Sequence, residues 1–156
     1  MRTIDDTYGD SVTGVLPTYG ANWNAGQTCS GCAVQPSPSG TYRGTWHDTT
    51  SDNPNSTTGH AVTLEFTGTA ISVYCILVNS GSPYVTIASY ISFEMDGDPA
   101  GTYTHNPDTS AGAAQYVYNA TVFSQTGLSN ASHTLLMNAT QGSQASLVLF
   151  DWAMYT

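Results

Sequence analysis

The fold is decided by the stretch Val62-Thr-Leu-Glu-Phe-Thr-Gly-Thr-Ala-Ile-Ser-Val-Tyr-Cys-Ile-Leu-Val78. Apolar and polar residues alternate through its first half, and this period of two is typical of a half-buried β-strand. The Thr-Gly-Thr at 67–69 is short enough to be a hairpin turn. From Ile71 onward both alternating rows are apolar, which predicts a central strand or one that lies beneath a covering loop.

The same alternation recurs along the rest of the chain, at 91–95, 116–122, 135–137 and 148–154. No window has apolar residues at the helical spacing over three turns. Counting the alternating runs gives about eight or nine strands, so we expect an all-β antiparallel sandwich. The residues expected in its core are Val62, Leu64, Phe66, Ile71, Val73, Phe93, Leu135, Phe150 and Trp152, together with Trp46.

Turn and loop signals separate these runs. Asp96-Gly97 predicts a tight turn, and the loops are expected at 79–83, 107–112 and 141–143. The segment from Tyr8 to Gly40 is rich in Gly and Pro and poor in strand signal, so we interpret residues 1–40 as a loop-rich N-terminal part packed on a single domain, 1–156. A chain of this length suits one core.

Charge excludes one large class of partners. The chain has 11 carboxylates against two arginines, Arg2 and Arg43, and no lysine, which gives a formal net charge of −9. Nucleic-acid binding draws most of its affinity from Lys and Arg on phosphates, so no nucleic-acid partner is expected. Anionic membrane surfaces are disfavoured for the same reason.

Several features indicate an extracellular or cell-surface protein. The polar residues are mainly hydroxyls and amides, and four glycosylation acceptor sequences begin at Asn55, Asn119, Asn130 and Asn138. No apolar stretch is long enough to span a membrane, and no signal-peptide core follows Met1. We interpret Met1 as an added start, so a membrane anchor would lie outside this sequence.

Three cysteines are present. Cys29 and Cys32 form a Cys-x-x-Cys pair among Gly, Pro and Ser, with no strand–helix–strand pattern after it. We therefore predict a small structural disulfide that shapes the loop carrying Trp23, in preference to a redox or zinc site. Cys75 lies in the most apolar run and is predicted to be a buried, unpaired thiol.

The order of motifs resembles a known group of proteins. Asp5-Asp6, Trp23, Gly44-Thr-Trp-His-Asp48, the 62–74 stretch, Phe93-Glu-Met-Asp-Gly97, Ser132-His-Thr-Leu135 and Leu149-Phe-Asp-Trp152 occur in sequence. This resembles the extracellular galactose-binding-like domains of fungal, especially basidiomycete, cell-surface proteins. The resemblance implies a jelly-roll sandwich of eight or nine strands and, by analogy, carbohydrate binding. A looser similarity to carbohydrate-binding modules implies a structural calcium ion held by Asp5, Asp6 and Asp151, although those modules usually carry Glu at the N-terminal pair.

Exposed aromatic side chains are the usual platform for a sugar ring. The aromatic residues outside the regular alternating rows are the candidates for glycan binding: Trp23, Tyr19, Tyr42, Tyr84, Tyr103 and His105. Trp23 is the leading candidate because it lies in the long N-terminal segment. The alternative for each tyrosine is a half-buried strand residue with its hydroxyl at the rim.

Catalytic signals are weak. His47-Asp48 could form an acid–base pair, but a hydrogen-bonded His beside a capping Asp explains it better. No nucleophile elbow is present, and the carboxylates form no diagnostic pair for glycoside hydrolysis. We therefore expect a non-catalytic module that binds neutral glycan. The alternatives are a structural or adhesive surface protein that self-associates into homo-oligomers and, less favoured, a glycoside hydrolase.

Overall fold

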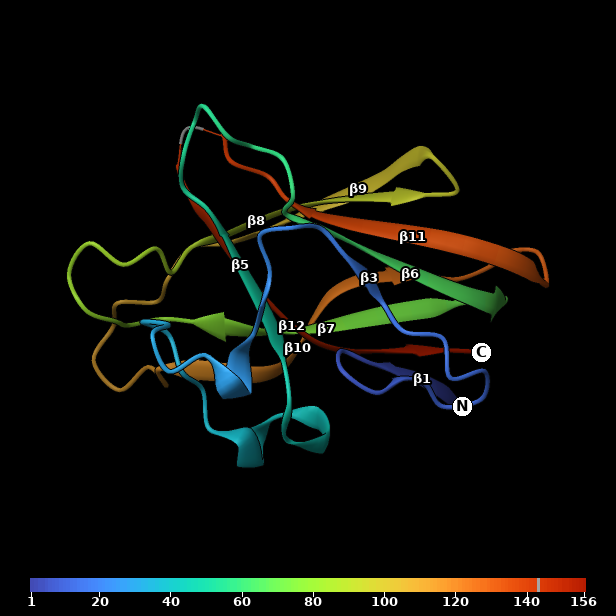
Figure 1. The fold of residues 1–156 in the computed structure, drawn as a ribbon, viewed down its shortest axis with the longest axis horizontal. Coiled ribbons are helices and arrows are strands. Elements are labelled where there is room, and N and C mark those ends of the chain that lie inside the picture. The colour runs from blue at the N-terminus through green and yellow to red at the C-terminus, as the bar shows by residue number, and fades with distance from the viewer. Residues whose placement is uncertain (143) are drawn as a thin grey trace.

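The computed structural model describes residues 1–156 except Ser143, so the predicted loop 141–143 falls partly outside the described residues. The described residues form twelve β-strands and three short 3₁₀ turns, and none of them lies in an α-helix (Figure 1). The strands are β1 (Arg2–Asp5), β2 (Gly9–Asp10), β3 (Thr18–Tyr19), β4 (Asn24–Ala25), β5 (His47–Ser51), β6 (Ala61–Gly68), β7 (Ile71–Val78), β8 (Ser89–Met95), β9 (Asp98–His105), β10 (Tyr116–Gln125), β11 (Ala131–Ala139) and β12 (Ser146–Tyr155).

The strands form two antiparallel sheets. The seven-stranded sheet runs β10-β7-β12-β1-β2, with β5 on the first half of β12 and β4 on β5; the five-stranded sheet runs β3-β6-β11-β8-β9. This confirms the predicted all-β sandwich of the jelly-roll type. Because Arg2 pairs with Tyr155, both chain ends lie at one end of the sandwich (Figure 1). The strands beyond the expected number are the short ones in the first 25 residues.

The main core lies between the two sheets. The predicted core residues are buried at 4% exposure or less, with one exception. Trp152 was expected in the core but is half-buried, because the β12–β7 register shifts between Phe150 and Trp152. The shift turns Trp152 to the outer face of the large sheet, where its ring stacks between Tyr42 and Tyr74 at centroid distances of 4.7 and 4.4 Å.

A second apolar cluster lies on that outer face. It contains Val34, Trp46, Ile76, Val78, Leu147 and Leu149. The β7 and β12 members alternate with residues of the main core, so they project from the opposite face of the sheet. Val34 and Trp46 cover this face. They belong to the region of the three 3₁₀ turns, η1 (Gly26–Thr28), η2 (Pro38–Gly40) and η3 (Tyr42–Gly44). The two-faced apolar pattern of 71–78 therefore reflects a covered central strand, as predicted.

We call residues 26–46 the covering segment. Its close approach explains two glycines: a Cβ on Gly26 would collide with the Trp46 indole, and one on Gly40 would collide with the Tyr118 ring. Cys29 and Cys32 form the predicted disulfide within it, and Cys75 is buried and unpaired with either. The Gln35 side-chain amide donates hydrogen bonds to the carbonyls of Cys29, Ser30 and Cys32. In the part of the chain that the structure describes, no helix has the length and apolar character to cross a membrane.

A β-bulge alters the predicted side-chain directions in β10. The register against β7 shifts between Val117 and Ala120, where Asn119 has a φ of 54°. Tyr118 therefore packs in the outer cluster while Ala120 packs against the main core, although strict alternation put both on one inner face. Asn119 is exposed, as are Asn55 and Asn130, and Asn138 is half-buried.

Candidate functional site

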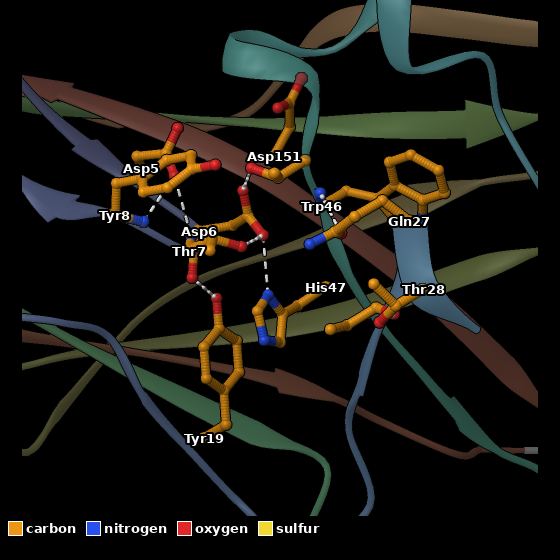
Figure 2. A network of polar contacts seen from close by, with 12 residues as sticks. Asp5, Asp6, Thr7, Tyr8, Tyr19, Gln27, Thr28, Trp46, His47 and Asp151 are labelled. Carbon is orange, nitrogen blue, oxygen red and sulfur yellow. Dashed lines mark hydrogen bonds and ion pairs between the residues drawn. The ribbon is translucent and has the colours of Figure 1, made fainter.

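The acidic residues Asp5, Asp6 and Asp151 lie together, buried at 1% exposure or less, where β1 meets β12 (Figure 2). We call them the acidic cluster. Both carboxylate oxygens of Asp6 are engaged: Oδ1 accepts from the Thr45 hydroxyl, and Oδ2 accepts from the Thr7 hydroxyl and pairs with His47 Nδ1 at 2.7 Å. His47 is thus a hydrogen-bonded structural residue, as the sequence favoured.

The other two carboxylates are less well satisfied. Asp5 Oδ1 accepts from two backbone amides and Asp151 Oδ1 accepts from the Tyr42 amide, but Oδ2 of each is buried without a hydrogen-bond partner. Burial raises the pKa of Asp151 to about 7, and the nearby charges of Asp6 and Asp5 add to that effect. Burial also raises the pKa of Asp5, against the lowering effect of its two amide donors.

The cluster fits a calcium ion in part. The unpartnered Oδ2 atoms of Asp5 and Asp151 are the hard oxygens that calcium prefers. Asp6, however, would have to give up a donor to bind an ion. Among the described residues, no group of three or more His, Cys, Asp or Glu side chains has an arrangement suited to a metal ion. Calcium binding at the acidic cluster stays a prediction.

Two of the aromatic candidates pack beside this cluster. Tyr19 stacks on His47 at 4.1 Å and donates its hydroxyl to the Asp6 carbonyl (Figure 2). Trp23 is half-buried, tilts against Tyr19 at 5.2 Å, and donates its indole N–H to the Ala61 carbonyl at 3.0 Å. Both side chains pack against the main core. Their contacts therefore hold the N-terminal segment on the small sheet.

This packing gives a testable expectation for Trp23. Replacing it with alanine should lower the free energy of unfolding by about 2–3 kcal/mol, because a half-buried aromatic contact with the core and one hydrogen bond are both lost. Urea unfolding followed by far-UV circular dichroism measures this. A Trp23→Ala variant of unchanged stability would show instead that the indole is free to act as a ligand platform.

The remaining candidates are spread over the molecule. Tyr42 stacks on Trp152, whose other neighbour is Tyr74, in a row on the outer face of the large sheet. Tyr103 is half-buried against the main core. His105 ends β9 in the five-stranded sheet, and its Nε2 lies 3.0 Å from Oδ1 of Asn79, which follows β7 in the seven-stranded sheet. The imidazole ring therefore connects the two sheets. The structure therefore does not assemble the predicted aromatic residues into one platform.

Tyr84 differs from all of these because its ring is free. It lies in the loop between β7 and β8, is fully exposed, and has a φ of 69°. A non-glycine residue in this left-handed region is strained, and such strain is concentrated at functional sites.

Tyr84 borders a cavity of about 270 Å³. We call it the Tyr84 pocket; β4, the disulfide loop, β5 with the residue after it, the 84–86 loop and the start of β12 contribute its wall. Its polar lining includes Asn24, Asp48, Thr50, Asp52 and Thr86, and Cys32 of the disulfide also lines it.

Asp48 is the polar centre of the Tyr84 pocket. It is 7% exposed; its Oδ1 accepts from the Asn24 amide at 3.3 Å, and its Oδ2 has no hydrogen-bond partner. Burial raises the pKa of Asp48, opposed by the Asn24 hydrogen bond and by the Trp46 indole N–H. That N–H faces the carboxylate but does not reach hydrogen-bond geometry with Oδ2. Oδ2 and the indole N–H are both shielded from solvent, so the polar side chains of the wall that a ligand would meet are those of Asn24, Thr50, Asp52 and Thr86.

A second cavity, of about 290 Å³, lies on β8 and β9, with Tyr90, Ser92, Thr102 and Thr104 in its wall. Its polar groups already bond to one another: the Thr140 hydroxyl donates to Ser92, and the Tyr90 hydroxyl donates to Gln144 at 2.8 Å. Nothing buried there lacks a partner among the described residues, apart from Gln141 near its rim. The Tyr84 pocket is the better candidate because it combines a fully exposed aromatic ring with exposed polar side chains.

Sequence reasoning named Tyr84 and Cys32 but did not connect them, and it missed Asn24 and Asp52. One signal was available. Asp48, Thr50 and Asp52 alternate along β5 and just beyond it, so they share one face of that strand. The pairing of β4 with β5, which brings Asn24 opposite Asp48, could not be read from a two-residue strand.

No protein-family model matches the chain, and no curated protein is similar to it in sequence. Solved structures do share its fold. A family two carbohydrate esterase from Clostridium thermocellum, in complex with cellohexaose, is 16% identical over 90% of this chain and 31% of its own, with a TM-score of 0.50. The Agl-KA catalytic domain is 9% identical over 97% of this chain and 26% of its own, with a TM-score of 0.54.

A family GH115 4-O-methyl-α-glucuronidase, BtGH115A, with specificity for decorated arabinogalactans, is 13% identical over 91% of this chain and 18% of its own, with a TM-score of 0.50. The chain thus spans less than a third of the length of each of these proteins. At such identities the likeness is one of fold: this chain has a β-sandwich that also occurs within carbohydrate-active proteins.

Proposed function

We propose that this chain is a non-catalytic carbohydrate-binding module and that the Tyr84 pocket binds the glycan. The observation that carries the proposal is a fully exposed aromatic ring at a cavity whose wall also holds the exposed side chains of Asn24 and Asp52. A sugar uses both features, since its C–H face stacks on an aromatic ring while its hydroxyls donate to carboxylates and amides. The shared fold of carbohydrate-active proteins supports this reading by analogy.

Neutral glycans suit this pocket better than acidic ones. Asp48 and Asp52 line it, and the lining residues that the structure describes include neither of the two arginines. An acidic sugar would meet like charge without a compensating cation, which costs affinity and slows association. Neutral glycans are thus the proposed ligand class of the module.

Binding is favoured over hydrolysis by the placement of the two acids. Asp48 and Asp52 are four residues apart on an extended chain, so their Cα atoms are roughly 13 Å apart. Glycosidases hold their two carboxyl groups about 5–9.5 Å apart across the scissile bond. His47, the other candidate for proton transfer, is occupied by Asp6.

The proposal places the module outside the cell, as in the fungal cell-surface domains that it resembles. A disulfide in a short loop persists in an oxidising compartment. The exposed acceptors Asn55, Asn119 and Asn130 suit glycosylation there. Intact-mass measurement of protein secreted from a eukaryotic host tests this, and unmodified protein would count against it.

Replacing Tyr84 with alanine tests the site. On a glycan found by array screening, Tyr84→Ala should weaken binding by about 1–3 kcal/mol, the scale of one aromatic contact, while stability stays within about 0.5 kcal/mol. Tyr8→Ala, which removes another exposed tyrosine, is the matched control and should bind normally.

Equal binding by Tyr84→Ala and the native chain would move the site elsewhere. If no glycan binds, and sedimentation velocity shows concentration-dependent oligomers, the self-associating surface protein becomes the better account of the chain.

A further inference from the structure

His133 of β11 is buried at 6% exposure, and both nitrogens of its ring face hydrogen-bond acceptors. Nδ1 lies 2.7 Å from Asp96 Oδ2, and Nε2 lies 2.8 Å from the Ser129 carbonyl oxygen. A carbonyl oxygen and an ionised carboxylate can only accept, so both ring nitrogens have to donate. Because a neutral imidazole has a single N–H, both bonds form only when the ring carries two protons and a positive charge.

Asp96 fixes one side of this arrangement. It lies in the turn between β8 and β9, and its Oδ1 accepts from the Thr134 backbone amide at 2.8 Å. Its own backbone amide donates to the Thr134 carbonyl, also at 2.8 Å. The β8–β9 turn is therefore held on β11 by two bonds that do not depend on the His133 ring.

The other partner, Ser129, belongs to a loop with fewer attachments. Residues 126–130 connect β10 to β11, and we call them the Leu128 loop. The Leu128 side chain packs against the main core, and its amide donates to the Thr69 carbonyl at 2.9 Å. The other residues of the loop are exposed. The His133 ring therefore ties an exposed loop to a turn that is already fixed.

Asp96 is the charged group that faces the His133 ring. The Ser129 carbonyl and the Asp96 carboxylate raise the pKa of His133 above its ordinary 6.5, and the His133 hydrogen bond lowers the pKa of Asp96. On the β6 side the ring contacts Phe66 at a centroid distance of 5.4 Å, and Glu65 is exposed on the other face of that strand. The Leu128 loop contains no ionisable side chain.

We propose that His133 is a pH-sensitive switch, which holds the Leu128 loop against the β8–β9 turn as an imidazolium and releases the loop when it loses a proton. The charge-assisted bond to Asp96 is the stronger of its two bonds, so the remaining proton stays on Nδ1. Nε2 then presents a lone pair to the Ser129 carbonyl oxygen, and two acceptors in contact repel each other. The loop therefore separates from the turn above the pKa of His133.

The switch acts on a cavity of about 450 Å³ that the turn and the loop border. Asp96 and Asp98 line it on one side, and Gln125 and Leu128 line it on the other. It shares no lining residue with the Tyr84 pocket, so the switch is separate from the proposed glycan site. The contribution of the charged ring is complete below about pH 6.5 and is lost as the pH rises through the higher pKa of the folded state.

Nuclear magnetic resonance tests the switch at the ring nitrogens of His133 and at the Leu128 amide. Long-range ¹H–¹⁵N spectra should show both nitrogens protonated at pH 5 and Nδ1 alone protonated at pH 9. Over this range the hydrogen-exchange protection of the Leu128 amide, corrected for the intrinsic pH dependence of exchange, should fall about tenfold, the scale of one hydrogen bond from a charged donor. Protection at Leu135, within β11, should fall much less.

The Asp96→Asn variant should remove the pH dependence. An asparagine suits the φ of 53° at this position and can keep the bond from β11 through Oδ1. Its side-chain amide can donate to Nδ1, so a neutral His133 keeps its proton on Nε2 and its bond to the loop. We therefore expect Leu128 to stay protected at pH 9. Asp98→Asn makes the same charge change at an exposed neighbour and should behave like the native chain.

The His133→Leu variant removes both bonds and should leave Leu128 poorly protected at pH 5 and at pH 9. If it folds poorly by circular dichroism, the comparison of Asp96→Asn with Asp98→Asn decides alone. A His133 ring with one proton at pH 5 would overturn the switch. So would equal protection of Leu128 at the two pH values in the native chain, or the same loss of protection in Asp96→Asn and Asp98→Asn.

Discussion

The Trp46→Ala variant is expected to lose about 3–5 kcal/mol of its free energy of unfolding, the scale for removal of a fully buried tryptophan. Trp46 is 2% exposed and is the largest fully buried side chain. With Val34 it joins the covering segment to Ile76, Val78, Leu147 and Leu149 on the outer face of the large sheet. Without the indole, this second cluster would have a cavity where its central side chain was.

The loss should be visible locally as well as globally. Gly26 lies directly against the indole, and its amide donates to the Trp46 carbonyl at 2.8 Å. The Tyr84 pocket is built on the same segment through Cys32 and Val34. We therefore expect Trp46→Ala to weaken glycan binding even at a temperature where the sandwich remains folded. Hydrogen exchange in residues 26–46 should rise more than in β6 or β11.

Trp152→Ala is the matched control, since it removes the same type of side chain from the face of the large sheet on which Trp46 packs. Trp152 is half-buried between two aromatic rings, so its removal should lower the free energy of unfolding by about 1–2 kcal/mol. Urea unfolding followed by far-UV circular dichroism compares the two without relying on tryptophan fluorescence. Equal losses would mean that the outer cluster contributes no more than a surface stack, contrary to this account of the covering segment.

Much of the sandwich could be predicted because local pattern and burial agree. Val62, Leu64 and Phe66 occupy one row of β6, and that row faces the core over the whole strand. When one face of a strand is buried, the direction of one side chain fixes the directions of all the others in that strand. The apolar outer row of β7 likewise predicted a covering layer, although the sequence did not indicate which residues supply it.

The predicted side-chain directions were wrong where a register shift interrupts the alternation along a strand. A register shift between Phe150 and Trp152 moved Trp152 out of the core, and another around Asn119 separated Tyr118 from Ala120. A bulge adds one residue to one strand but not to its partner. The hydrophobic periodicity of a sequence does not show where this extra residue lies. The pocket was hidden for a related reason, because its wall comes from five segments that meet only through tertiary pairing.

The pocket and the acidic cluster differ in how much the sequence revealed. The similarity to carbohydrate-binding modules implied the grouping of Asp5, Asp6 and Asp151, and they lie together because the end of β1 pairs with the middle of β12. Their hydrogen bonds were not predictable, since the partners Thr45 and His47 lie at the end of the covering segment and just after it.

In the presence of a chelator, the domain is expected to be more stable at pH 5 than at pH 8. Asp151 has a folded-state pKa of about 7, against 3.8 for an ordinary aspartate. The folded chain therefore keeps a proton that the unfolded chain releases, and the free energy of unfolding falls as the pH rises from about 4 to about 7. At about 1.4 kcal/mol per pKa unit, a shift of this size corresponds to an effect on the order of 4 kcal/mol. Asp5, whose pKa is also raised by burial, acts in the same direction.

The Asp151→Asn variant isolates this contribution. An asparagine keeps an oxygen that can accept from the Tyr42 amide, at the position of Asp151 Oδ1, and it cannot ionise. Its melting temperature in chelator should therefore vary less between pH 5 and pH 8 than that of the native chain. Glu94→Gln changes the same charge at an exposed site and should keep the native pH dependence. A native chain that is equally stable or more stable at pH 8 would refute the assignment of a buried, protonated Asp151.

The same titration decides whether calcium binds the acidic cluster. An ion coordinated by Asp5 and Asp151 through their unpartnered Oδ2 atoms would keep both carboxylates ionised and remove the penalty that develops between about pH 4 and pH 7. Added calcium should then raise the melting temperature at pH 8 and have little effect at pH 5, where protons compete for the same oxygens. Asp151→Asn should abolish the response, because an amide oxygen is a weaker ligand and carries no charge. A native chain with the expected pH dependence but no response to calcium would show that a proton, and not a metal ion, neutralises the cluster.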